Sequence, residues 1–141
     1  EEGGQDDFSR MGEYFAERAS TGVGLIITGG ISPNEEGALD GAIFNQESQV
    51  SRHKLVTDAV HKANADTKIC MQILHSGPLA ISKELVAASP VRSRIGRLVP
   101  NEMSLEVLRK QVSDFIECAE LCKKANYDHW FSWIFYFYFF R

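Results

Sequence analysis

The chain has 141 residues, which is enough for one domain with a hydrophobic core. Its hydrophobic content of 44% and its charged content of 24% are ordinary for a soluble globular protein. The net charge of −4 disfavours a nucleic-acid partner, because proteins that bind nucleic acid usually carry a basic face.

Targeting and membrane segments are not evident in the sequence. The first residues, EEGGQDDFSR, lack a charged-then-apolar leader, and before the last twelve residues no apolar run approaches the ~20 residues that a membrane helix needs. We therefore expect a cytoplasmic protein with no membrane partner. Cys70, Cys118 and Cys122 form no C-x-x-C pair, which favours free thiols. Cys118 and Cys122 share a helix face, which indicates packing more strongly than redox or metal chemistry.

The chain begins with a predicted helix followed by a predicted strand. Apolar residues recur at helical spacing from about Asp7 to Ala19, and Gly22 is a suitable helix stop. The run VGLIITGG, residues 23–30, is apolar and rich in branched side chains. Such a run predicts a strand buried on both faces, as in a parallel sheet covered by helices.

A second helix is predicted from roughly Glu47 to Ala63, followed by a second strand in KICMQILHSG, residues 68–77. His53 and His61 lie on this helix eight residues apart, which is too far for a shared metal ion. We expect both imidazoles to be solvated.

A third helix is predicted from Ser104 to about Ala125, with Ser104 as its cap, and NYD, residues 126–128, should begin a third strand. The connections from strand to helix are long, whereas those from helix to strand are short. In parallel α/β folds the loops at the carboxyl ends of strands build the site, so the long loops after Gly30 and Gly77 mark the functional face. The recurring unit fits a (β/α)8 barrel or a doubly wound sheet, and three units are too few to close a barrel.

Two strand ends carry the candidate site residues. The glycine pair in TGG, residues 28–30, lets a ligand approach the backbone, although simple turn chemistry explains it as well. It is not a G-x-G-x-x-G fingerprint, which disfavours a Rossmann dinucleotide site. Gln72 places an amide inside an otherwise apolar strand, and a buried amide needs a partner. That partner is either another protein group or a ligand, and the residues alone leave both open.

Other polar residues at this face are less informative. His75, at the end of the second strand, is more often structural than catalytic in such a position. The stretch VRSRIGR carries Arg92, Arg94 and Arg97, which could meet an anionic substrate. An ordinary solvated loop is the favoured interpretation of these arginines.

The ordered set YFAERASTGVGLIITGGISP, MQILHSG, LVAASPV and CAELCKKANYD resembles the old yellow enzyme family. The set is similar in particular to the bacterial-type 2,4-dienoyl-CoA reductases and related NADH:flavin oxidoreductases, and the resemblance covers roughly residues 8–128. It implies an α/β fold in which this chain forms part of an FMN-binding (β/α)8 TIM barrel, about strands 2–4 with their helices. Residues 1–7 would be a leading segment.

The resemblance also implies a chemistry. Gly30 matches the small residue that packs against the flavin, and Gln72 matches the glutamine that hydrogen-bonds the pyrimidine edge of the flavin. An amide can donate to one heteroatom and accept from another, and such contacts tune the cofactor. The family transfers a hydride from NAD(P)H to FMN and then to a small-molecule substrate, an activated alkene of the enoate or 2,4-dienoyl-CoA type.

Several positions depart from the family pattern. The first barrel strand should precede residue 1, and Pro78 stands where the family's H-x-G-R motif has arginine. No residue matches the family's proton donor, so no catalytic residue is assigned. We do not expect this polypeptide alone to bind FMN well. The alternative is a non-catalytic α/β scaffold, derived from the same barrel, that acts through protein contacts.

The chain ends in WFSWIFYFYFFR, in which nine of twelve residues are aromatic. Twelve residues are too short for a membrane helix, and the run lacks the alternation of a half-buried strand. Phe and Tyr codons are rich in T, so a translated pyrimidine-rich intron would give such a run. We therefore expect residues 129–141 to be foreign to the fold.

Overall fold

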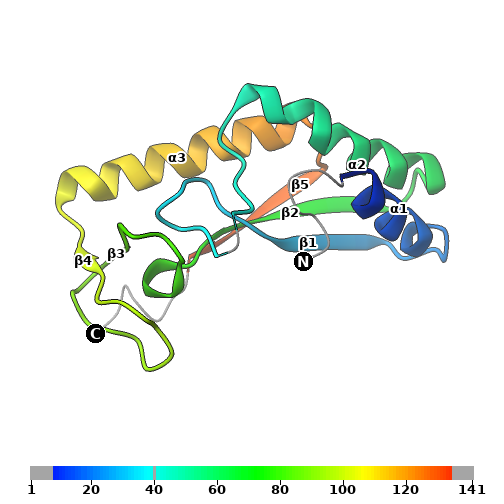
Figure 1. The fold of residues 1–141 in the computed structure, drawn as a ribbon. Helices are drawn as coiled ribbons and strands as arrows, with labels where there is room; N and C mark the ends of the chain where they lie inside the picture. The colour runs from blue at the N-terminus through cyan, green and yellow to red at the C-terminus, as the bar shows by residue number, and fades with distance from the viewer. Residues whose placement is uncertain (1–7, 40, 135–141) are drawn as a thin grey trace. The chain divides into compact units, whose positions relative to one another are not determined.

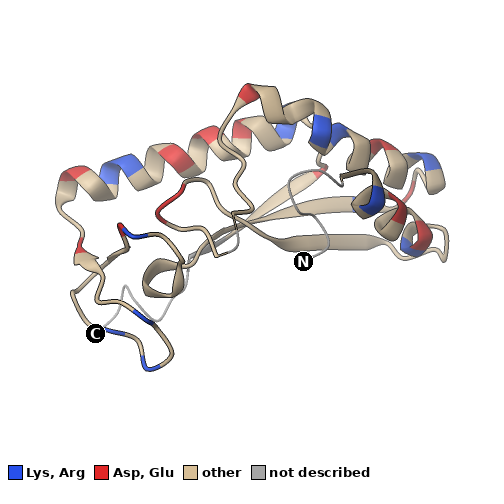
Figure 2. Ribbon diagram, in the orientation of Figure 1, with Lys and Arg blue, Asp and Glu red and all other residues tan. Residues whose placement is uncertain are grey.

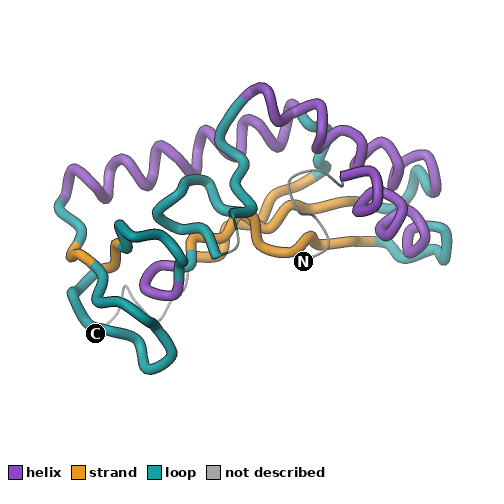
Figure 3. The backbone as a smooth tube through the Cα atoms, in the orientation of Figure 1, coloured by secondary structure: helices purple, strands orange, loops and turns teal. Residues whose placement is uncertain are grey.

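The computed structural model describes residues 8–39 and 41–134 (Figure 1). Helices alternate with strands along the chain (Figure 3). In chain order the elements are α1 (Phe8–Ala19), β1 (Leu25–Ile31), η1 (Glu47–Gln49), α2 (Val50–Ala63), β2 (Lys68–His75), η2 (Gly77–Leu79), β3 (Val86–Ala87), β4 (Asn101–Glu102), α3 (Leu105–Lys124) and β5 (His129–Ile134). The predictions for residues 1–7 and for the last seven residues lie outside the described residues.

The three predicted helices are confirmed, and local chemistry explains two of their ends. Gly22 follows α1 with φ +86°, a left-handed conformation that glycine adopts without steric cost. Ser104 precedes α3, and its Oγ accepts a hydrogen bond of 3.2 Å from the N–H of Val107. This bond satisfies one of the free donors of the first helical turn, as the predicted cap requires.

The main sheet has the strand order β1–β2–β5. Three hydrogen bonds join β1 and the residues before it to β2 at one constant spacing. The Oγ1 of Thr67 donates to the carbonyl of Val23, the N–H of Lys68 donates to the carbonyl of Gly24, and the N–H of Gln72 donates to the Oγ1 of Thr28, each across 44 residues. A constant spacing means that the two strands run in the same direction. The sequence-predicted parallel α/β arrangement is therefore present in this pair.

Two compact units make up the chain, and the described part of the first covers residues 8–30, 46–72 and 119–131. In this unit α1 and α2 lie on the same side of the strands (Figure 1). A Cβ on Gly12 of α1 would lie 3.1 Å from the carbonyl oxygen of Leu55, so the absence of a side chain lets the two helices approach closely. The largest fully buried apolar side chains of the unit come from α2 and β2: Val56, Val60, Ile69 and Met71.

The expectation that β1 is buried on both faces is wrong. Burial alternates along the strand, with Ile26 and Thr28 buried while Leu25 and Ile27 are 50% and 51% exposed. Among the described residues, helices of the first unit cover only one face of this strand. The run is apolar throughout, so its composition could not distinguish a face covered by helices from an open one.

The third strand begins at His129, slightly later than predicted. Before it, Asn126 has φ +63° and turns the chain at the end of α3, and Asn is among the residues that tolerate this conformation. β5 continues through residue 134 and so includes the first part of the aromatic run, of which Trp130 is 46% exposed. The foreign origin of residues 129–141 remains a hypothesis. A spliced transcript that encodes them in frame would contradict it.

The described part of the second unit covers residues 31–39, 41–45, 73–118 and 132–134. Its small sheet pairs β3 with β4 in parallel, with Val86 opposite Asn101 and Ala87 opposite Glu102. Within the described ranges, no helix is both long and apolar enough to cross a membrane.

Candidate flavin-binding and polar sites

Gln72, the first candidate residue, lies on β2 in the first unit. Its N–H donates to the Oγ1 of Thr28 on β1 at 3.1 Å, which fixes the backbone of the strand at this point. The side chain is half-buried, whereas Met71 and Ile73 on either side are 0% and 1% exposed. No hydrogen bond to the Gln72 carboxamide is formed by the residues that the structure describes. The amide predicted to need a partner therefore remains available to a ligand.

The glycine pair ends the part of β1 that belongs to the first unit. Gly30, the second candidate residue, is half-buried. A Cβ on Gly29 would meet no atom within 4 Å, so the backbone here borders open space. Thr28 joins this stretch directly to Gln72 through the 3.1 Å bond. The structure thus brings the two sequence-predicted cofactor residues onto hydrogen-bonded neighbouring strands.

His75 at the end of β2 is 8% exposed and packs against Gly37. A Cβ on Gly37 would lie 2.5 Å from the Cδ2 of His75, so only glycine fits beside the ring. The Nδ1 of His75 accepts a hydrogen bond from the N–H of Gly77 at 3.0 Å. Burial lowers the pKa of His75, while the carboxylates of Glu36 and Asp114 act to raise it. These contacts fit the structural role that the sequence favoured.

The expectation that His53 is solvated is wrong. His53 is 1% exposed, and its Nδ1 lies 3.0 Å from the hydroxyl of Tyr127. Phe8 packs edge-on against the same imidazole, with ring centroids 4.8 Å apart. Burial, together with the positive charge of Arg52, lowers the pKa of His53 to about 3. The ring is therefore neutral at physiological pH and belongs to the core of the first unit.

His61 is also paired rather than solvated. Its Nε2 lies 2.8 Å from Asp128, whose carboxylate accepts the N–H of Ile69 at 2.9 Å and lies 3.3 Å from the Nζ of Lys68. Burial acts to raise the pKa of Asp128, but the bonds from Ile69, His61 and Lys68 outweigh it and lower that pKa to about 2. Asp128 thereby fixes the chain that enters β5 to the start of β2.

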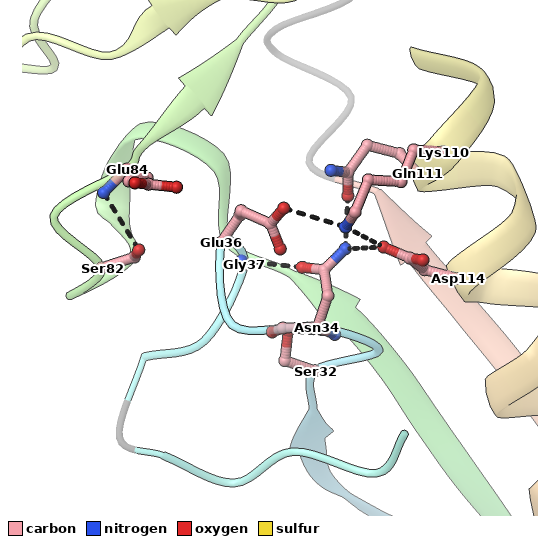
Figure 4. A network of polar contacts seen from close by, with 9 residues as sticks. All are labelled: Ser32, Asn34, Glu36, Gly37, Ser82, Glu84, Lys110, Gln111 and Asp114. Atoms are coloured by element: carbon pink, nitrogen blue, oxygen red, sulfur yellow. Dashed lines mark hydrogen bonds and ion pairs between the residues drawn. The ribbon is translucent and has the colours of Figure 1, made fainter. Parts of the chain in front are cut away.

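The second unit contains a polar network that the sequence analysis missed (Figure 4). The Nδ2 of Asn34 donates to the Oε1 of Gln111 and to Asp114, both at 2.6 Å, and its Oδ1 accepts the N–H of Gly37 at 3.0 Å. Asn34 and Gln111 are 4% and 6% exposed. In the sequence, Gln111 is the residue that could have indicated this network. It lies one helical turn from Val107 and one from Phe115, so a polar amide stands on the apolar side of α3.

Carboxylates line the cavity beside this network, which has a volume of about 620 Å³. The Nζ of Lys110 lies 2.9 Å from Glu36 and 2.8 Å from Asp114. Burial acts to lower the pKa of Lys110, but its bonds to Asp114 and Glu36 outweigh it and raise that pKa. Lys110 therefore neutralises part of the acidic lining. No group of three or more metal-binding side chains was found in the part of the chain that the structure describes.

The arginines of the loop between β3 and β4 are exposed, and basic residues are the only charged ones along this loop (Figure 2). All three cysteines are buried and none forms a disulfide bond with another described residue, and the Sγ of Cys122 lies 3.1 Å from the Sδ of Met71. Their burial fits the packing role that the sequence favoured.

Comparisons with known proteins agree on one family. The profile described as "NADH:flavin oxidoreductase / NADH oxidase family" matches residues 1–130. The chain is 30% identical over 119 residues to an NADPH dehydrogenase of Listeria welshimeri, a match that covers 82% of this chain and 34% of that protein. It is 27% identical over 127 residues to an NADH oxidase of Thermoanaerobacter brockii, covering 84% of this chain and 19% of that protein. The chain thus spans about a third or less of the length of these relatives.

Solved structures give the same fold. An old yellow enzyme homologue from Zymomonas mobilis superposes with a TM-score of 0.75 at 26% identity, covering 86% of this chain and 38% of that one. A structure of morphinone reductase in complex with tetrahydroNAD superposes with a TM-score of 0.77 at 20% identity, covering 86% and 39%. The predicted fold class, a partial (β/α)8 barrel, is confirmed.

Proposed function

Because the chain belongs to the NADH:flavin oxidoreductase / NADH oxidase family, we propose that it supplies part of the cofactor site of an FMN-dependent NAD(P)H oxidoreductase. The proposed substrate is an activated alkene of the enoate or 2,4-dienoyl-CoA type. The observation that carries the proposal is the carboxamide of Gln72, which has no protein partner within the described ranges although it lies half-buried in an apolar strand.

FMN fits the residues present on these two strands. The pyrimidine edge of a flavin presents both hydrogen-bond donors and acceptors, and a carboxamide can satisfy one of each. Gly29 borders open space, so a planar ring could approach the backbone there without meeting a side chain. When bound, FMN supplies the reversible hydride chemistry by which NAD(P)H reduces an alkene.

The roles proposed for the chain's own residues are binding and orientation. Gln72 would hold the flavin edge, and Gly30 would leave room for the ring. The hydrogen bond from the N–H of Gln72 to the Oγ1 of Thr28 would fix the position of the Gln72 carboxamide along β2 relative to Gly29 and Gly30 on β1. No residue of this chain is proposed as the proton donor.

The experiment is a titration of the purified chain with FMN, followed by assay for NADPH or NADH oxidation with 2-cyclohexenone as the acceptor. Saturable flavin binding that Gln72→Leu weakens supports the proposal, and turnover of the acceptor would extend it to the reaction. If FMN does not bind at millimolar concentration, the alternative non-catalytic scaffold explains the chain better.

A further inference from the structure

The loop from residue 88 to residue 100 is held closed at its base by β3 and β4. The N–H of Asn101 donates to the carbonyl of Leu85 at 2.7 Å, and the N–H of Met103 donates to the carbonyl of Ala87 at 2.9 Å. The ends of the loop are therefore fixed side by side, which lowers the entropy cost of ordering the residues between them.

The tip of this loop is a turn, and the three arginines lie in it or directly beside it. The N–H of Gly96 donates to the carbonyl of Ser93 at 3.1 Å, which closes a four-residue turn with Arg94 in its second position. The chain reverses at this turn, so Arg92 and Arg97 flank it on either side. A Cβ on Gly96 would lie 3.0 Å from the carbonyl oxygen of Pro78, so the turn packs closely against η2.

Two properties of the loop indicate a ligand rather than solvent alone. Its three arginines are exposed, and none forms an ion pair with a carboxylate in the described residues, although the chain as a whole is acidic. Apolar side chains interleave with them and are also exposed: Val91 (61%), Ile95 (81%), Leu98 (48%) and Val99 (60%). Cationic and apolar groups on one loop match a ligand that has both anionic and flat apolar parts.

We propose that loop 88–100 binds the phosphorylated ribose and the adenine of an adenine nucleotide. Guanidinium groups bind phosphate through paired hydrogen bonds, and the exposed apolar side chains offer contact area to the base. The proposal rests on the proposed function, whose reaction would use NADPH, with a 2′-phosphate, and candidate substrates that include coenzyme A thioesters, with a 3′-phosphate. The two ligands share this chemistry.

The test is calorimetric titration of the purified chain with adenosine 2′,5′-bisphosphate, adenosine 3′,5′-bisphosphate and 5′-AMP, without flavin. We expect at least one bisphosphate to bind tenfold or more tightly than 5′-AMP. Preference for the 2′,5′ isomer assigns the loop to NADPH, and preference for the 3′,5′ isomer assigns it to coenzyme A. If the two bisphosphates bind equally well, and both more tightly than 5′-AMP, the result supports the chemistry that the two ligands share.

Variants locate the site. The combined change Arg92→Ala, Arg94→Ala and Arg97→Ala should weaken bisphosphate binding at least tenfold, and replacing the same residues by Lys should weaken it less. The control removes as much charge from exposed helix positions, through Lys62→Ala, Arg109→Ala and Lys123→Ala. Circular dichroism establishes that each variant is folded before titration.

Three results would overturn the proposal: equal binding of 5′-AMP and the bisphosphates, equal weakening by the control, or no nucleotide binding together with arginine-dependent binding to phosphatidylglycerol vesicles. The last would assign the loop to an anionic lipid surface. Because no flavin is present, failure here with intact FMN binding would leave the proposed function standing.

Discussion

The buried imidazole of His53 predicts a specific loss of stability in acid. Its pKa is about 3 in the folded chain and 6.5 in the unfolded one, so the unfolded chain takes up a proton first as the pH falls. The stabilisation due to the neutral ring is complete above pH 6.5 and is lost progressively toward pH 3. One pH unit in this window corresponds to about 1.4 kcal/mol, so the free energy of unfolding should fall by about 2 kcal/mol between pH 7 and pH 5.

Urea denaturation at pH 7, 6 and 5 measures this effect. His75 adds to the slope of the native chain, because burial lowers its pKa too, so the informative quantity is the difference between variants. His53→Gln should remove about 2 kcal/mol of the pH dependence, since Gln does not titrate in this range. Tyr127→Phe removes the hydroxyl 3.0 Å from Nδ1 and should lower stability by about 1 kcal/mol while it keeps the slope. Parallel pH profiles for the native chain and His53→Gln would show that the pKa of His53 is not lowered in the folded chain.

Three further predictions concern stability and are measured by the same denaturation assay. Asp128→Asn should lower the free energy of unfolding at pH 7 by about 1–2 kcal/mol, because the pKa of Asp128 is about 2 in the folded chain, below its ordinary value of 3.8. This stabilisation is lost as the pH falls from 3.8 toward 2. The control is Asp58→Asn, on the exposed side of α2. Gly37→Ala should cost about 1–3 kcal/mol, because its Cβ would lie 2.5 Å from the His75 ring, whereas Gly29→Ala meets no atom and should cost less. Asn34→Ala should cost about 1–3 kcal/mol by leaving buried partners unpaired, and an unchanged denaturation midpoint would contradict the network.

The helices and strands could be predicted from the sequence because the pattern that identifies each one lies within its own segment. Helical spacing and the Ser104 cap located α3, and the apolar runs located β1 and β2. Which faces are covered was harder to predict, because it depends on distant parts of the chain. The exposure of Ile27 could not be seen in a uniformly apolar run.

In the candidate site, too, the sequence singled out individual residues but not the contacts between distant ones. Gln72 stood out because an amide is unusual in an apolar strand. The burial of His53 depends on Tyr127, 74 residues away, and the burial of Asn34 depends on Gln111, 77 residues away. The partners in each pair lie far apart in the sequence, so the sequence predicted a solvated His53 and did not single out Asn34.

Contact of Gln72 and Gly30 with FMN can be detected by nuclear magnetic resonance of the isotopically labelled chain during titration with FMN. This measurement detects weak binding and reports on each amide group separately. We expect shifts in the Gln72 carboxamide and in the backbone amides of Gly29 and Gly30, with no shift at the Asn64 carboxamide, which is held by the carbonyl of Ala19. The Gln72→Leu variant should weaken binding, whereas Asn101→Leu, an exposed amide on β4, should not. Unmoved Gln72 and Gly30 signals at millimolar FMN, or equal FMN binding by the Gln72→Leu variant, would show that these residues do not contact FMN.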